Sequence, residues 1–226
     1  AARGRHGAPE VRPLRYASRF VSPAVKAALN VLCRVDSREL ERIPRDGPFI
    51  VVINHINFLE VPMLYTFLYP RDVVGLVKAE TWKNPLMKAL ADTWSAIPLD
   101  RSSTDLGAMR GALDALKRGK FLAIAPEGTR SGDGRMCRAH AGVVSIAVRS
   151  GAPIVPVAHF GGERFWDNLR SLKRTEFHFR VGEPFTLARP ETGLTKAARQ
   201  EMADEVMRRL ALLLPERYRG VYADAR

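Results

Sequence analysis

The sequence predicts an α/β fold: a single domain with a largely parallel sheet flanked by helices, plus an N-terminal amphipathic helical appendage. Two observations carry this prediction. From Pro48 onward, short apolar runs alternate with longer stretches of helical periodicity, which is the pattern of parallel strands joined by crossover helices. The 226 residues, 46% of them hydrophobic, are also enough to fill a sizeable core. We therefore divide the chain into a basic segment, residues 1–45, and a domain, residues 46–226.

The first 45 residues carry half of the excess positive charge of the chain. They hold 10 Lys and Arg against 4 Asp and Glu, a net charge of +6, where the whole chain has +12. Within residues 14–35, apolar side chains recur at helical spacing among cationic ones, and Pro23 suggests a break or a helix start. Such a basic amphipathic helix suits a membrane interface. A helix packed on the core of the domain, with solvated basic edges, explains the pattern equally well.

The strands of the domain are predicted from apolar runs, and the helices from the longer periodic stretches between them. The predicted strands cover residues 49–53, 73–77, 96–99, 121–125, 154–158 and 175–181. The predicted helices cover residues 61–69, 81–93, 104–119, 139–150 and 195–214. The strand at 175–181 alternates apolar and polar side chains, so we expect it to be more exposed than the others.

Charge and composition limit the classes of function. A net charge of +12 calls for an anionic partner, but we find neither an aromatic single-strand platform nor a reading helix, so we expect no nucleic acid partner. The longest uncharged runs, residues 47–59 and 150–162, are 13 residues each and too short to span a bilayer. No secretory signal is expected. Two cysteines make no disulfide framework and favour a reducing compartment.

A histidine and a glutamate follow the strand at 49–53. If both lay on one helix, His55 and Glu60 would be about 140° apart, so they can meet only across a strand-to-helix turn. Pro62 fits the start of the helix after such a turn. A carboxylate bonded to one ring nitrogen orients the imidazole and raises the basicity of the other nitrogen, which can then take a proton from a hydroxyl. By itself, the same spacing also fits a core histidine beside an unrelated glutamate.

Three further blocks lie at or beside predicted strands. Residues 95–101 read Ser-Ala-Ile-Pro-Leu-Asp-Arg, residues 125–131 read Ala-Pro-Glu-Gly-Thr-Arg-Ser, and residues 152–157 read Ala-Pro-Ile-Val-Pro-Val. Open α/β sheets bind their ligands at the carboxyl ends of the strands. We find no Gly-x-Ser-x-Gly elbow, no His-Glu-x-x-His and no phosphate-binding loop of the Walker type, and we predict no metal site and no cofactor.

With these four blocks in this order, residues 48–185 resemble the glycerolipid acyltransferase family typified by 1-acylglycerol-3-phosphate acyltransferase. The resemblance implies that His55 is the general base and that Glu60 orients it. It places the acceptor phosphate against Arg101 and against Glu127, Gly128, Thr129 and Arg130, with Lys78 nearby. Taken from the residues alone, Glu127 is a poor phosphate ligand and is better suited to hold Arg130 or a substrate hydroxyl; Lys78 can equally be a solvated surface residue.

Two departures from the family pattern concern the catalytic and acceptor sites. Glu60 stands where the family has Asp, so its extra methylene must be absorbed by a shifted helix start or a folded side chain. Ser95 stands where the second block usually has Gly, which we interpret as a sign of a differently shaped acceptor pocket. Large aromatic and aliphatic side chains in residues 58–69 and 82–94 can form either core or an acyl channel.

The resemblance implies transfer of a fatty acyl group from acyl-CoA or acyl carrier protein to the free hydroxyl of 1-acylglycerol-3-phosphate, giving phosphatidic acid. The expected partners are this acceptor, the acyl donor and an anionic membrane surface, with the enzyme peripheral at the cytoplasmic face of the cell membrane. One alternative is another lysolipid or glycolipid acceptor. A second is a non-catalytic, membrane-binding relative in which Glu60 has broken the pair with His55.

Overall fold

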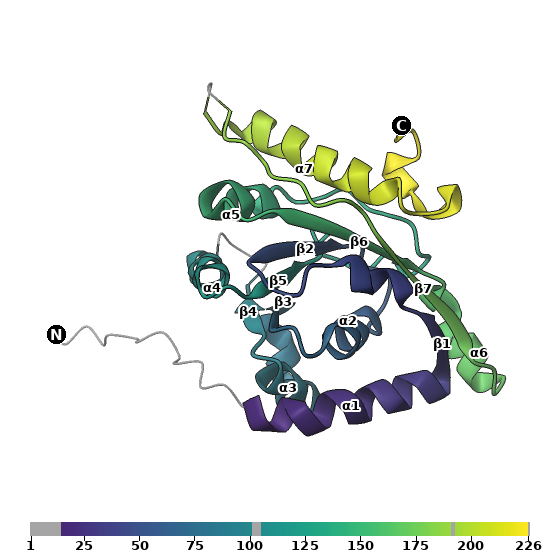
Figure 1. The fold of residues 1–226 in the computed structure, drawn as a ribbon. Helices are drawn as coiled ribbons and strands as arrows, with labels where there is room; N and C mark the ends of the chain where they lie inside the picture. The colour runs from purple at the N-terminus through teal and green to yellow at the C-terminus, as the bar shows by residue number, and fades with distance from the viewer. Residues whose placement is uncertain (1–14, 101–104, 191–192, 226) are drawn as a thin grey trace.

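The computed structural model describes residues 15–100, 105–190 and 193–225, and it contains one seven-stranded sheet (Figure 1). The strand order is β1-β7-β6-β2-β5-β3-β4, and every neighbouring pair is parallel except β6 and β7. The predicted α/β class is confirmed. The strands are β1 (Cys33–Asp36), β2 (Phe49–Ile53), β3 (Val73–Lys78), β4 (Ile97–Leu99), β5 (Phe121–Ile124), β6 (Ile154–Phe160) and β7 (Thr175–Val181).

Helices cover both faces of the sheet. In Figure 1, α5 and α7 lie above it, and α1, α2 and α3 lie below it. The alternation of side chains along β2 matches this arrangement: Ile50 and Val52 pack with α4, α5 and α7, whereas Val51 and Ile53 pack with α1 and α2. The helices are α1 (Arg15–Leu32), α2 (Glu60–Leu68), α3 (Pro85–Thr93), α4 (Leu106–Lys117), α5 (Gly142–Ser150), α6 (Phe165–Arg170) and α7 (Lys196–Ala211).

Side-chain caps explain where three of these helices begin. The side chains of Asn84, Asp105 and Thr195 each accept a hydrogen bond from a backbone N–H in the first turn of α3, α4 and α7. The predicted helix at 81–93 is therefore divided, because Asn84 and Pro85 start α3 after a 3-10 helix, Ala79–Lys83. The predicted helix at 139–150 begins later, at Gly142.

The N-terminal segment contains a long helix and an edge strand. The helix α1 runs through Pro23 without a break, so the break predicted there is wrong. Its inner face is buried at Ser22 and Leu29, whereas Phe20 and Val31 on its outer face are 78% and 71% exposed. The inner face thus packs on the domain, and the membrane interface stays a prediction for the outer face. Strand β1, which the sequence did not predict, pairs with β7, so β7 lies inside the sheet; the division at residue 45 stays a prediction.

Candidate active site

The turn after β2 is held to the neighbouring strand by Asn54. The side-chain amide of Asn54 donates to the carbonyl of His159 at 2.9 Å and accepts from its N–H at 2.9 Å, so it pairs with β6 as a peptide group would. His159 is fully buried, and burial lowers the pKa of its ring, which favours the neutral form. The function of Asn54 was missed because its signal, a polar residue at the end of a buried strand, has many explanations.

His55 and Glu60 meet across the turn as their spacing predicted. Nδ1 of His55 contacts one carboxylate oxygen of Glu60, and the other oxygen accepts from the N–H of Asn57 at 3.0 Å. Glu60 is the first residue of α2 and its side chain folds back over the turn, which absorbs the extra methylene. The side chains of Glu60 and His55 are 1% and 11% exposed. The expectation that Glu60 breaks the pair is therefore wrong.

This contact orients the imidazole. With Nδ1 engaged by the carboxylate, the ring presents Nε2, for which the described residues provide no hydrogen-bond partner. Glu60 also lies at the amino end of α2, where the helix dipole favours a negative charge. The arrangement suits an imidazole that accepts a proton at Nε2 while the carboxylate stabilises the resulting cation.

Glu127 braces this turn from the other side. One carboxylate oxygen accepts from the N–H of His55 at 2.8 Å, and the other accepts from the N–H of Cys137 at 2.6 Å. The side chain is almost fully buried, and burial raises the pKa of its carboxyl to about 7. Both oxygens are thus engaged by backbone groups, a set of contacts that the sequence did not predict.

The loop that carries the Glu-Gly-Thr-Arg block runs beside the histidine turn. The N–H groups of Ser131 and Gly132 donate to the carbonyls of His55 and Ile56 at 2.9 and 3.2 Å. Within this loop, Gly128 has a φ of 66°, and a side chain there would collide with the ring of His140. A glycine is therefore required at this position.

The C-terminal segment supports the same loop. The N–H of Met136 donates to the carbonyl of Tyr218 at 2.9 Å, and the N–H of Val221 donates to the carbonyl of Met136 at 3.2 Å. The hydroxyl of Tyr222 accepts from the N–H of Ala139 at 3.1 Å. These contacts join residues far apart in the sequence, so no local pattern predicted them.

A pocket of about 320 Å³, here called the His55 pocket, opens beside the ring. Its lining includes five predicted site residues: His55, Lys78, Gly128, Thr129 and Arg130. The lining also contains apolar side chains, among them Val61, Leu64, Leu76, Val77 and Leu99. The structure thus brings together most of the predicted site. Arg101 lies outside the described residues, although Leu99 at the end of β4 reaches the pocket.

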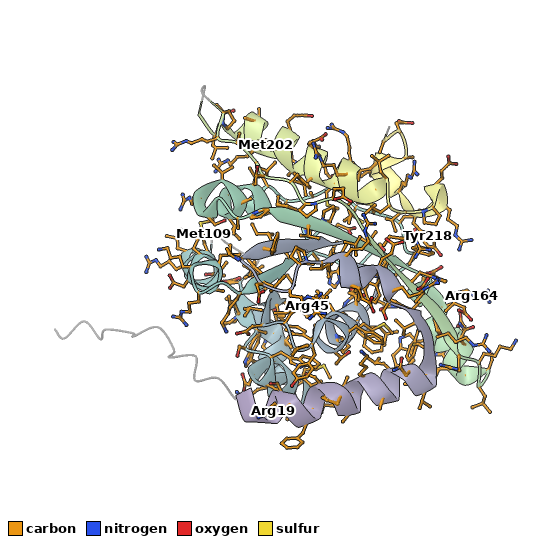
Figure 2. All side chains as sticks on the ribbon, viewed as in Figure 1. Arg19, Arg45, Met109, Arg164, Met202 and Tyr218 are labelled. Carbon is orange, nitrogen blue, oxygen red and sulfur yellow. The ribbon has the colours of Figure 1, made fainter. Side chains whose placement is uncertain are left out.

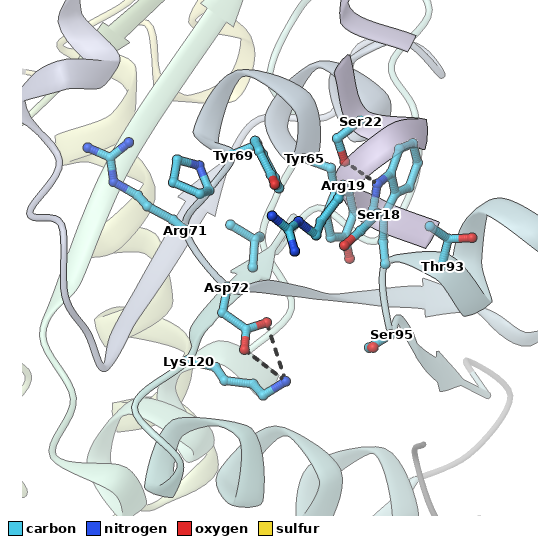
Figure 3. Close-up of a pocket in the computed structure, with 13 residues that line it drawn as sticks. Ser18, Arg19, Ser22, Tyr65, Tyr69, Arg71, Asp72, Thr93, Ser95 and Lys120 are labelled. Carbon is cyan, nitrogen blue, oxygen red and sulfur yellow. Dashed lines mark hydrogen bonds and ion pairs between the residues drawn. The ribbon is translucent and has the colours of Figure 1, made fainter. Parts of the chain in front are cut away.

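Ser95 does not line the His55 pocket. It lines a second cavity of about 400 Å³, here called the α1 cavity, beneath the start of α1 (Figure 3). The interpretation of Ser95 as a sign of a differently shaped acceptor pocket stays a prediction. Its φ of 52° lies in the left-handed region, which explains why glycine is the usual residue there.

Among the residues that the structure describes, no cluster of three or more His, Cys, Asp or Glu side chains could hold a metal ion. Within the same ranges, no helix combines the length and the apolar character needed to cross a membrane.

An α/β domain that holds a histidine against a buried carboxylate, beside a partly apolar pocket, is typical of enzymes that move a proton on a substrate hydroxyl. Comparison with known proteins narrows this class. A family model described as Acyltransferase matches residues 34–159, and the chain therefore belongs to the acyltransferase family. The predicted enzyme class is confirmed.

Curated relatives differ in the acceptor that their names give. The 1-acyl-sn-glycerol-3-phosphate acyltransferase of Bacillus subtilis is 25% identical over 166 residues, which cover 74% of this chain and 81% of that protein. The Pseudomonas aeruginosa protein of that name is 32% identical over 136 residues, 59% of this chain and 51% of that one. The lyso-ornithine lipid O-acyltransferase of Pseudomonas aeruginosa is 27% identical over 218 residues, 88% of this chain and 80% of that protein.

A solved structure supports the same assignment. The crystal structure of the 1-acyl-sn-glycerophosphate acyltransferase PlsC from Thermotoga maritima superposes with a TM-score of 0.61 and 25% sequence identity. The match covers 86% of this chain and 80% of that one. The family resemblance predicted from the four blocks is confirmed.

Proposed function

We propose that this acyltransferase moves a fatty acyl group from a thioester, acyl-CoA or acyl carrier protein, to the free hydroxyl of 1-acylglycerol-3-phosphate. One observation carries the proposal: the Glu60-oriented ring of His55 lines a pocket whose lining combines two cations, Lys78 and Arg130, with apolar side chains. A lysophospholipid likewise combines a phosphate with an acyl chain. The names of the relatives support the same acceptor.

The chemistry needs one base. Nε2 of His55 takes the proton of the acceptor hydroxyl as its oxygen attacks the thioester carbonyl carbon. The carbon–sulfur bond then breaks, and the thiolate takes the proton back from the imidazolium, leaving an ester and a free thiol. Because a thiol has a pKa of about 8.5, the leaving group needs little assistance. Glu60 stabilises the imidazolium during the step.

The cations of the pocket suit the acceptor phosphate. Arg130 offers a planar, permanently charged guanidinium for two parallel hydrogen bonds, and Lys78 offers a point charge at the end of β3. Arg101, two positions after the end of β4 in the sequence, lies outside the described residues and is proposed from the family resemblance as a further phosphate contact. Glu127 acts in this scheme as the brace of the histidine turn, since both its oxygens are occupied.

The outer face of α1 gives the enzyme a place to meet its lipid substrate. The exposed side chains of Phe20 and Val31 form an apolar stripe on a helix that belongs to a strongly basic segment. We propose that this face lies in the interface of an anionic membrane, at its cytoplasmic side, and holds the enzyme there peripherally.

A second candidate acceptor is a lyso-ornithine lipid. The relative of that name matches a larger share of this chain, 88%, than either protein named for 1-acylglycerol-3-phosphate that is described above. The catalytic step is the same for both acceptors, because each provides a hydroxyl.

Acceptor profiling tests the proposal. The purified chain is given labelled acyl-CoA, or acyl carrier protein charged with the same chain, and equal concentrations of lysophosphatidic acid and lyso-ornithine lipid. We expect labelled phosphatidic acid as the main product. Turnover of lyso-ornithine lipid alone would move the proposal to the second acceptor, and turnover of neither would contradict both.

A further inference from the structure

The turn between α6 and β7 presents a large apolar side chain to solvent. Leu172 is 94% exposed and has a φ of 53°, a backbone conformation that favours glycine or asparagine over leucine. Trp166, on the adjoining helix, is 54% exposed. Neither burial nor backbone geometry accounts for a leucine here, and two large apolar side chains are exposed within seven residues of one another.

Three cationic side chains lie on the same segment as these two apolar residues, and Figure 2 labels one of them, Arg164. Arg164, Arg170 and Lys173 are all exposed, and the exposed acid on α6, Asp167, lies 3.7 Å from Arg170. We call the five residues Arg164, Trp166, Arg170, Leu172 and Lys173 the α6 corner. An apolar projection with a basic surround suits a surface that is anionic outside and apolar beneath, which describes the headgroup region of an anionic bilayer.

The α6 corner continues the apolar face of α1. The guanidinium of Arg174, the residue after the corner, donates to the carbonyls of Asn30 and Cys33 at 2.5 and 2.7 Å, at the carboxyl end of α1. Val31 and Leu32 are exposed at that same end. Figure 1 shows α6 beside the end of α1 that leads into β1, along one edge of the molecule.

The corner is also joined to the catalytic turn. The ring of Trp166 stacks on Phe58 with centroids 5.3 Å apart, and Phe165 meets Phe58 edge-on at 5.7 Å. The side chain of Asn57 donates to the carbonyl of Gly162 at 2.6 Å, just before α6. The segment 162–166 thus contacts Asn57 and Phe58, which lie between His55 and Glu60.

We propose that the α6 corner is a second lipid-binding surface, which inserts Leu172 and Trp166 into an anionic bilayer and, with α1, seats the histidine turn at the interface. The inference rests on the proposed function only in that the substrate is a lipid. A bilayer is favoured over an acidic protein because Leu172 projects from a turn that continues an exposed helix face, and a fluid interface accepts such a projection without a matching cavity.

Vesicle sedimentation tests this surface without any turnover. The full chain is mixed with vesicles of phosphatidylglycerol and phosphatidylcholine in equal parts. Leu172→Asn removes the apolar projection and places a residue that tolerates the positive φ, so the thermal unfolding temperature should stay equal or rise. We expect the partition coefficient to fall about three- to ten-fold. The matched control is Val221→Asn, an exposed apolar residue on the C-terminal segment, which should bind as the parent does.

A charge variant gives an independent measurement. Arg170→Gln with Lys173→Gln should lower binding about five-fold for each cation removed and should weaken its salt dependence. Unchanged binding by both variants would overturn the proposal. So would unchanged vesicle binding together with a raised KM for acyl carrier protein alone, which would make the corner a protein-docking surface. A chain that binds vesicles through the corner but transfers no acyl group would contradict the proposed function and leave this inference standing.

Discussion

Tyr65 separates two cavities, which differ more in the polar groups that line them than in their volumes. The His55 pocket has a volume of about 320 Å³ and the α1 cavity about 400 Å³, and Tyr65 lines both, its ring stacked on Trp94. The His55 pocket lies at the carboxyl ends of β3 and β5, whereas the α1 cavity lies at their amino ends, where Val73 begins β3 and Lys120 precedes β5.

Several polar groups that line the α1 cavity have partners within the protein. In Figure 3, Lys120 is paired with Asp72, at 3.2 Å, and the indole N–H of Trp94 donates to the hydroxyl of Ser22 at 3.2 Å. The guanidinium of Arg71 donates to the carbonyls of Ile43 and Pro44.

The His55 pocket is different because its lining includes the oriented ring of His55. The Nε2 atom of this ring has no hydrogen-bond partner among the described residues. The comparison teaches that an oriented proton acceptor, rather than volume, distinguishes the candidate active site.

The largest expected difference between the cavities is catalytic. His55→Ala removes the proposed base and should lower kcat/KM by about 10³-fold, because a positioned general base contributes roughly 10² to 10⁴. Lys120→Met, in the α1 cavity, should leave kcat/KM within about two-fold. Initial rates with thioester donor and lysolipid acceptor provide the measurement. Equal rates for His55→Ala and the parent would remove the catalytic distinction between the two cavities.

Glu60→Gln tests the orientation of the ring. The amide keeps the size of the side chain but lacks the charge that stabilises the imidazolium, so kcat should fall about 10- to 100-fold with KM little changed. The matched control is Asp72→Gln, which removes the carboxylate charge from the α1 cavity instead. This variant should leave kcat unaffected. A selective rise in KM for Glu60→Gln would indicate that the carboxylate binds substrate instead.

The buried carboxyl of Glu127, beside the His55 pocket, should make the free energy of unfolding depend on pH. Burial raises the pKa of this carboxyl from 4.5 to about 7, so between these values the folded chain binds more protons than the unfolded chain. Below pH 4.5 the contribution of Glu127 to the free energy of unfolding is complete. As the pH rises to about 7 this contribution is lost, and the loss is on the order of 1–3 kcal/mol.

Glu127→Gln removes this titration. The free energy of unfolding of the parent, relative to that of the variant, should therefore decrease from about pH 5 to about pH 8 in urea titrations. A difference that stays constant with pH would mean that Glu127 keeps one protonation state throughout.

The smallest expected effect lies in the α1 cavity. Ser95→Gly relieves the positive φ and should stabilise the chain by up to about 1 kcal/mol, since the strain of the serine exceeds the entropy cost of the glycine. Calorimetry would show a higher unfolding temperature, with kcat/KM as in the parent. A change in acceptor preference would connect this cavity to substrate binding after all.

Most of the sheet could be predicted because its central strands are short apolar runs, and a short apolar run between polar segments is typical of a buried strand. The strands at 49–53 and 175–181 are found at those residues, and the other four differ at their ends by one or two residues. Strand β1 was missed because Cys-Arg-Val-Asp is short and half polar, and it becomes a strand only by pairing with β7, over 140 positions away. Helix α6 was missed because six residues hold too little periodicity.

The sequence by itself determined which residues form the candidate dyad and that they meet across a turn, because His55 and Glu60 are five positions apart and local geometry decides their contact. It also determined the family, through four blocks in a fixed order. Only the tertiary structure decided that Glu127 binds two backbone N–H groups, one of them 72 positions away, and that Ser95 faces the other cavity. Such contacts depend on how the strands are ordered in space, and a side chain carries no local record of the neighbour that the fold gives it.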